Sequence, residues 1–213
     1  MAVPRVWAVI VAAGWGERFG GPKQFSELGG ARLVDHAVAT ASAACDAVVL
    51  VVPDAAAWQG ADVAALVTGG SSRAESVRAG LAAVPITAEV IVVHDAARPL
   101  ATTALFEAVI GAVRGGAEGA VPGLAVADTL KRVDDVRVTA TVDRVGLVAV
   151  QTPQAFDAGI LRAAHAAAPE ATDDAALVEA ISGTVVVVPG DPRNLKVTGP
   201  ADLMIAAALL ETS

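Results

Sequence analysis

Short apolar runs alternate with amphipathic segments along the first half of the chain. The runs are rich in valine and alanine and are too short for long helices, so we interpret them as buried strands. The predicted strands are residues 6–11, 47–52, 90–93 and 119–124. Between them, apolar residues recur three and four positions apart, which is the spacing of one helix face. The predicted helices are residues 32–43, residues 74–83 and a helix that starts near Thr102.

Two segments of the first half allow more than one interpretation. Residues 54–59 are compatible with a short helix. Residues 63–67 fit a third strand, but the Asp-Val-Ala-Ala-Leu pattern is equally helical. In either case the alternation of strands and helices favours a parallel sheet. We therefore predict an α/β fold of Rossmann-like type, with a doubly wound, mostly parallel sheet.

The second half begins with a different pattern, at residues 125–150. Residues 126–133 and 136–142 alternate between apolar and polar side chains, and Asp134 and Asp135 between them form a turn signal. This pattern predicts a projecting β-hairpin arm, richer in charge and threonine than the strands of the sheet. We expect residues 1–213 to form a single domain, with this arm packing on another subunit.

The chain then returns to the body of the domain at residues 147–151. The segments predicted after this point are a loop at 152–156, helices at 157–167 and 173–182, a strand at 184–188 and a final helix at 200–211. The helix at 173–182 shows no special chemistry, so we interpret it as scaffold. We interpret His94 as a strand-end residue and place His36 and His165 on exposed helix surfaces.

Composition restricts the class of protein. The chain has 213 residues, of which 54% are apolar, enough for one sizeable core. Its net charge of −8 argues against nucleic-acid or membrane-surface binding, because there is no basic excess. Cys45 is the only cysteine, which excludes an intrachain disulfide and favours a cytoplasmic protein. No apolar run approaches the roughly 18 residues that a membrane span needs.

The first predicted strand runs directly into a glycine-rich loop with two cations. The glycines let backbone N–H groups approach an anion closely, and Arg18 and Lys23 would neutralise it, which is typical of a phosphate-binding loop. A dinucleotide fingerprint is disfavoured because its third glycine is missing, and a P-loop because Pro22 and Gln24 replace required residues. The remaining interpretation is a loop that wraps a triphosphate, with the two cations as direct partners.

The motifs along the chain then give a specific resemblance. Residues 12–18 and 22–24 resemble the signature loop of the nucleotidyltransferases that activate sugar and polyol phosphates. Further matches, in the same order as in those enzymes, are residues 69–77, 94–99, 128–131, 142–144, 152–154 and 195–198. Together they resemble the 2-C-methyl-D-erythritol 4-phosphate cytidylyltransferase family of non-mevalonate isoprenoid synthesis, over almost the whole chain.

The resemblance implies that a phosphomonoester attacks the α-phosphorus of CTP and that pyrophosphate leaves. This nucleophile is largely a dianion at neutral pH, so the reaction needs positioning and cations rather than a general base. The family motifs imply that Arg18, Lys23 and Lys196 are the catalytic cations. They also imply a Mg²⁺ ion between phosphate oxygens. Asp95 is the best candidate to support this metal or to hold a substrate hydroxyl, and the sequence does not decide between these roles.

The same resemblance implies two binding sets and a dimer. We expect the nucleotide on Ala12, Ala13, Gly14, Gly16, Gly70, Ser71, Ser76, Asp95 and Ala96. We expect the methylerythritol phosphate on Asp95, Arg98, Thr129, Arg144, Thr152 and Thr172. Thr129 and Arg144 belong to the arm, which in the resembled family swaps across a homodimer to serve the neighbour's site. Phe19 and Asp174 stand where the family often has Met and Glu.

Three alternatives remain open from the sequence. Ribitol 5-phosphate cytidylyltransferases look closely similar and differ in the acceptor. An NAD-dependent oxidoreductase would need the missing third glycine. A nucleotide-binding module without catalytic activity would use the same phosphate loop.

Overall fold

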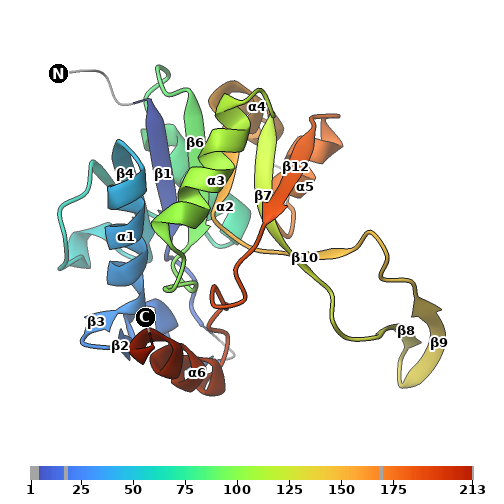
Figure 1. Ribbon diagram of the computed structural model, residues 1–213. Helices are drawn as coiled ribbons and strands as arrows, with labels where there is room; N and C mark the ends of the chain where they lie inside the picture. The colour runs from blue at the N-terminus through green and yellow to red at the C-terminus, as the bar shows by residue number, and fades with distance from the viewer. Residues whose placement is uncertain (1–4, 17–18, 168–169, 213) are drawn as a thin grey trace.

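The computed structural model describes residues 5–16, 19–167 and 170–212, which form a central sheet with helices on both faces (Figure 1). The strands of this sheet are β1 Val6–Val11, β4 Ala47–Val52, β5 Ala65–Thr68, β6 Val90–Asp95, β7 Gly119–Ala125, β10 Val148–Val150, β11 Gln154–Asp157 and β12 Val185–Pro189. The helices are α1 Leu33–Ala44, α2 Arg73–Ala83, α3 Thr103–Arg114, α4 Ala158–His165, α5 Asp174–Ala180 and α6 Pro200–Glu211. Smaller elements are the 3-10 turns η2 Lys23–Phe25 and η3 Ala55–Ala57, the short strands β2 Glu27–Leu28 and β3 Ala31–Arg32, and the hairpin strands β8 Leu130–Asp134 and β9 Arg137–Val142.

The sheet is mostly parallel, as the alternating pattern predicts. Its strand order is β10-β7-β11-β6-β1-β4-β5, and β12 pairs with β7. β1 pairs in parallel with both β4 and β6, whereas β10 and β11 run antiparallel to their neighbours. The predicted Rossmann-like α/β fold is therefore confirmed. Because β6 and β4 lie on opposite sides of β1, the loops after β1 and β6 diverge and leave room for a ligand at the carboxyl edge.

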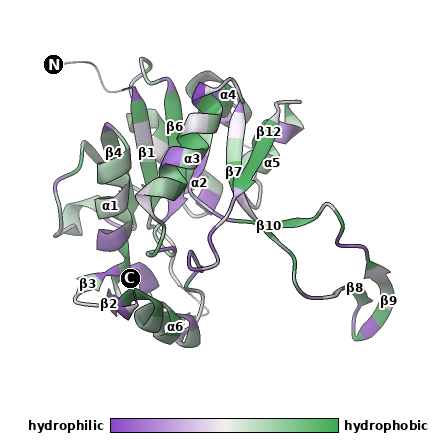
Figure 2. Cartoon of the chain, in the orientation of Figure 1, coloured by the Kyte–Doolittle hydropathy of each residue, from purple (hydrophilic) through white to green (hydrophobic). Residues whose placement is uncertain are grey.

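Alternate residues of the strands face two helical layers. Ala8 and Ile10 of β1 pack in the layer that holds α1 and α3, whereas Val9 packs in the layer that holds α2, α4 and α5. Gly80 allows α2 to approach the sheet closely, because a Cβ atom there would collide with Val9 and come within 3.1 Å of Val51 Cγ2. Figure 2 shows how the hydrophobic residues concentrate on the strands and on the helix faces that cover them.

The structure corrects several local predictions. Residues 152–156 are predicted as a loop, but Gln154–Asp157 form β11, which lies between β6 and β7. The polar Gln154 and the preceding Pro153 conceal this strand in the sequence; the Gln154 side chain is buried and donates to Asp173. Of the two interpretations of residues 63–67, the strand is confirmed, although β5 begins only at Ala65, and residues 54–59 contain only a 3-10 turn.

The predicted arm is a separate two-stranded hairpin. β8 and β9 pair with each other and project away from the sheet, joined to it through β7 and β10 (Figure 1). Asp135 in the turn has a φ of +52°, a left-handed conformation that aspartate tolerates better than most residues. The side chains at Val133, Val136 and Val138 are more than half exposed.

Within the described part of the chain, no helix combines the length and the apolar character that crossing a membrane would require.

Candidate active site

A cavity of about 490 Å³ opens at the carboxyl ends of β1 and β6. Segments distant in the sequence form its wall, including the loop after β1, the start of α2 and the segment before α6. The lining residues are Val11, Ala12, Ala13, Gly14, Trp15, Gly16, Lys23, Gln24, Gly70, Ser71, Ser72, Arg73, Ser76, Asp95, Ala96, Ala97, Lys196 and Thr198. The structure thus brings together both described catalytic candidates, Lys23 and Lys196, and the whole predicted nucleotide set. Arg18 lies outside the described residues.

The loop after β1 is shaped around one carbonyl group. The carbonyl oxygen of Gly16 accepts hydrogen bonds from the N–H groups of Phe19, Gly20 and Gly21, at 2.8, 3.0 and 3.3 Å. Gly16 has a φ of +66°, and a Cβ atom there would collide with the carbonyl oxygen of Gly21. Glycine is therefore required at this position for the chain to turn. The turn leads the backbone toward Lys23 on the cavity wall.

The second loop, at residues 69–72, is fixed by the first turn of α2. Ser72 caps the helix by accepting from the N–H of Glu75, and the Glu75 carboxylate accepts from the N–H and hydroxyl of Ser71 at 2.6 Å. Ser76 donates to the Ser72 carbonyl at 2.9 Å and accepts from Gly70 N–H at 3.2 Å. Its hydroxyl proton is thus committed to the loop, so toward a ligand Ser76 has only acceptor capacity left.

Gln24 is a cavity residue that the sequence predictions did not include. Its side chain is 4% exposed, and within residues 5–16, 19–167 and 170–212 its Nε2 atom has no hydrogen-bond partner. A buried amide donor without a partner costs free energy, which a ligand oxygen in the cavity would recover. The family motif around Lys23 was the only sequence signal that pointed to it.

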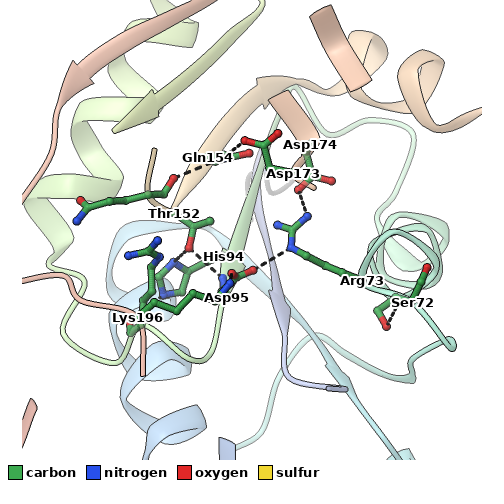
Figure 3. Close-up of polar contacts among 12 residues, drawn as sticks. Ser72, Arg73, His94, Asp95, Thr152, Gln154, Asp173, Asp174 and Lys196 are labelled. Atoms are coloured by element: carbon green, nitrogen blue, oxygen red, sulfur yellow. Dashed lines mark hydrogen bonds and ion pairs between the residues drawn. The ribbon is translucent and has the colours of Figure 1, made fainter. Parts of the chain in front are cut away.

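Asp95 is held between two cations at the end of β6 (Figure 3). Its two carboxylate oxygens accept from Arg73 Nε at 3.1 Å and from Lys196 Nζ at 2.5 Å. Burial by itself would raise the pKa of Asp95, but the charges of Arg73 and Lys196 outweigh it and hold this pKa well below its usual range. The Lys196 side chain is 38% exposed and that of Asp95 10%, so the ammonium group remains accessible from the cavity.

Arg73 is fixed from its other side by a buried acid. Its Nη1 lies 2.9 Å from Asp174 Oδ2, and Asp174 Oδ1 accepts from His165 Nε2 at 3.0 Å. Burial would lower the pKa of Arg73, but the carboxylates of Asp95 and Asp174 raise it. Two predictions were therefore wrong: the 173–182 segment is more than scaffold, and His165 is buried. The sequence contains no pattern that pairs these residues across the fold.

His94 and Thr152 form a buried pair beside Asp95. His94 Nε2 lies 3.2 Å from the carbonyl oxygen of Arg98, which can only accept, so Nε2 carries the proton. His94 Nδ1 then accepts from the Thr152 hydroxyl at 3.1 Å, while the Thr152 oxygen accepts from Asp95 N–H. Thr152, predicted to bind substrate, is thus buried and engaged with protein groups in this structure.

The remaining predicted substrate residues do not line the cavity of their own chain. Arg98 donates to the carbonyl oxygens of Asn194 at 2.8 Å and Val150 at 3.5 Å. Thr172 is exposed before α5, and Thr129 and Arg144 are exposed on the arm. Arg144 donates to the carbonyl oxygens of Val126 and Ala127.

Metal-binding capacity at the site is limited. In the described ranges, no group of three or more His, Cys, Asp or Glu residues could hold a metal ion, and Asp95 is the only acid among the cavity-lining residues. A Mg²⁺ ion that takes most of its ligands from phosphates and water is compatible with a single carboxylate.

The buried His94 generates a prediction about stability. Burial lowers the pKa of His94 to about 4, against about 6.5 in an unfolded chain. The unfolded state binds this proton first, so the contribution of His94 to stability is complete above about pH 6.5 and is lost as pH falls toward 4. We expect the free energy of unfolding to decrease by roughly 3 kcal/mol across that window through His94 alone.

Urea denaturation of the wild type and of His94→Asn at several pH values measures this contribution. The free energy of unfolding of the variant should fall less than that of the wild type between pH 6.5 and 4, whatever its absolute stability. If the free energy of unfolding fell equally with pH in the wild type and in the variant over this window, a neutral, buried His94 would be contradicted.

Comparison with known proteins assigns the family. Residues 6–212 match the IspD family, described as 2-C-methyl-D-erythritol 4-phosphate cytidylyltransferase. A protein of that name from Nocardia farcinica is 46% identical over 219 residues, covering 97% of this chain and 94% of the relative. A bifunctional IspD/IspF enzyme from Clavibacter michiganensis is also 46% identical, and this chain matches 55% of its length.

A solved structure agrees with these relatives. The crystal structure of 2-C-methyl-D-erythritol 4-phosphate cytidylyltransferase from Thermus thermophilus superposes with a TM-score of 0.84 at 34% identity, covering 97% of this chain and 99% of that one. The match therefore includes the sheet, the cavity and the segment before α6 alike. This chain belongs to the 2-C-methyl-D-erythritol 4-phosphate cytidylyltransferase family.

Proposed function

We propose that the cavity at the carboxyl ends of β1 and β6 is where this enzyme carries out the family reaction. The 4-phosphate of 2-C-methyl-D-erythritol 4-phosphate attacks the α-phosphorus of CTP, and pyrophosphate leaves. The observation that carries the proposal is the convergence of Lys23, Lys196 and Asp95 with two backbone loops around one cavity. These groups come from both ends of the chain, and this convergence provides the charges that a triphosphate requires.

The two loops are the proposed nucleotide site. Cytosine and ribose would lie against the small residues 12–14 and the loop at 70–76, where the absence of large side chains leaves the backbone accessible. Asp95 and Ala96 complete this wall. Gln24 adds a buried amide donor. Trp15 is 69% exposed and lies on the cavity rim, where it would cover the bound nucleotide.

The cations are the proposed catalytic groups. Negative charge on the α-phosphate and on the leaving pyrophosphate increases during the reaction, and fixed ammonium and guanidinium groups stabilise it. Lys196 and Lys23 supply two of these charges, and the family motif assigns Arg18 as a third. Since the attacking phosphate is already largely ionised, no general base is needed. The neutral His94 is buried behind Asp95 and is not required for proton transfer.

Mg²⁺ is the proposed metal cofactor. It would neutralise phosphate oxygens and align the triphosphate for attack. Asp95 is the protein group suited to support it, because its low pKa keeps it ionised at the cavity wall. Holding a substrate hydroxyl remains the second role for Asp95.

We also propose a cytoplasmic homodimer in which the arm of one copy completes the site of the other. The chain would act as a single domain, residues 1–213, with residues 125–150 as the dimerisation arm. Valines at positions 133, 136, 138 and 145 are 59–85% exposed, an apolar surface that a second copy would cover. Thr129 and Arg144 would then bind the partner's methylerythritol phosphate, together with Arg98, Thr152 and Thr172 of the body.

A two-substrate assay tests the activity. We expect pyrophosphate release from CTP and Mg²⁺ with 2-C-methyl-D-erythritol 4-phosphate, and at least tenfold less with ribitol 5-phosphate, since the acceptor site discriminates by its polar contacts. An enzyme-coupled pyrophosphate assay measures both rates under the same conditions. Faster release with ribitol 5-phosphate would reverse the acceptor assignment, and no release with either would refute the proposed activity.

Hybrid dimers test the arm. Arg144→Ala removes a proposed acceptor contact from the arm, and Lys23→Ala removes a cation from the cavity, so each variant alone should lose activity. Mixing the two should restore about a quarter of wild-type activity, because half of the dimers are hybrids with one intact site each. Mass spectrometry of tagged subunits controls for exchange. Exchange without any recovery of activity would contradict site sharing.

A further inference from the structure

The segment that carries Lys196 has no regular secondary structure. We call residues 194–199, which lie between β12 and α6, the strap. Lys196 and Thr198 line the cavity, while Val197 between them is fully buried against Leu28 and Leu33. The N–H of Val197 donates to the carbonyl oxygen of Ala97 at 2.8 Å. The strap is therefore extended, with its alternate side chains in the cavity and in the core.

Asp202, on the first turn of α6, holds the end of the strap. A single carboxylate oxygen, Oδ2, accepts from Thr198 N–H at 2.7 Å, from the Thr198 hydroxyl at 2.5 Å and from Gly199 N–H at 2.8 Å. These N–H groups precede the helix and would otherwise have no intrahelical acceptor. One side chain thus fixes the backbone two residues after Lys196.

The same carboxylate lies within electrostatic reach of the other lysine. Hydrogen bonds from Thr198 and Gly199 are the main causes that lower the pKa of Asp202, and the charge of Lys23 lowers it further. Lys23 belongs to η2, near the other end of the chain. The direct contacts of Asp202 on the cavity side are its hydrogen bonds to the strap.

The bond to Asp202 also determines what Thr198 does in the cavity. The Thr198 hydroxyl has one proton, and it donates that proton to Asp202. Toward the cavity the hydroxyl oxygen can only accept. Its suitable partners are therefore ammonium groups or substrate hydroxyls, whereas phosphate oxygens would be repelled. Thr198 is suited to orient cations and unsuited to bind the triphosphate directly.

We propose that Asp202 is a positioning residue for the catalytic Lys196, which makes the start of α6 part of the active site. It acts on Lys196 through the strap and Thr198. The inference rests on the proposed function in assigning turnover to Lys196. The hydrogen bonds of Asp202 to Thr198 and Gly199, which we call the anchor, can be tested without turnover.

Steady-state kinetics of Asp202→Ala tests the role in catalysis. A displaced cation weakens the transition state more than the bound substrate, so we expect kcat to fall about 10- to 100-fold with less than a threefold change in KM for CTP. Asp202→Asn, which keeps an accepting oxygen, should recover part of the loss. Asp157→Ala is the matched control, because Asp157 caps α4 through the N–H groups of Gly159 and Ile160, away from the cavity-lining residues. It should keep the wild-type kcat.

A double variant shows whether the effect passes through Lys196. If it does, adding Asp202→Ala to Lys196→Ala should lower kcat by no more than about threefold further. The proposal would be overturned if Asp202→Ala lowered kcat by the same factor in the Lys196→Ala background as in the wild type. It would also be overturned if folded Asp202→Ala had a kcat within twofold of the wild type. An inactive wild type would instead refute the proposed function.

Hydrogen exchange tests the anchor independently of activity and with folded protein only. The amides of Thr198 and Gly199 should exchange at least tenfold faster in Asp202→Ala than in the wild type. In Asp157→Ala their exchange rates should equal those of the wild type. Equal protection of these two amides in the wild type and in Asp202→Ala would overturn the proposal even if the enzyme were inactive. Thr198→Val, which removes only the hydroxyl, is the milder variant to use if Asp202→Ala does not fold.

Discussion

The ion pairs around Asp95 are the interaction on which the rest of the site depends. A carboxylate that is 10% exposed is costly unless its charge is compensated, and here Arg73 and Lys196 compensate it from two sides. Arg73 in turn needs Asp174, and Asp174 is bonded to His165. Charges therefore alternate from the core of the α4–α5 layer to the cavity wall. Removing Arg73 would take one partner from each of two buried carboxylates, those of Asp95 and Asp174.

These pairs explain how distant parts of the chain can form one site. β6 provides Asp95, α2 provides Arg73, and the strap provides Lys196, so each pair ties one loop of the carboxyl edge to the next. The backbone supplies the rest. Gly16 turns the first loop and Ser72 caps α2, which leaves small residues facing the cavity. The charged groups of the cavity are therefore held by several partners, whereas the two loops present small residues to it.

The sequence predicted the parts of this site that depend on local pattern. The strand before the glycine loop, the alternation that gives a parallel sheet, and the arm are all encoded within short windows of sequence. Lys196 was identified only through its motif, because no periodicity relates it to Lys23. The sequence did not predict Asp174 or the burial of His165, since a buried ion pair between α2 and α5 depends on how the layers pack. Similarly, β11 was missed because tertiary partners satisfy its Gln154.

Lys196→Ala most directly tests the claim that this cavity performs catalysis and does not merely bind a nucleotide. The account predicts a loss of about 10²- to 10³-fold in turnover, while CTP affinity by calorimetry changes by less than tenfold, since the ammonium acts mainly on charge that develops in the reaction. Arg114→Ala, which removes an equal charge at the end of α3, should change neither quantity. Unchanged turnover in Lys196→Ala, or a loss of CTP affinity as large as the loss of turnover, would contradict the account.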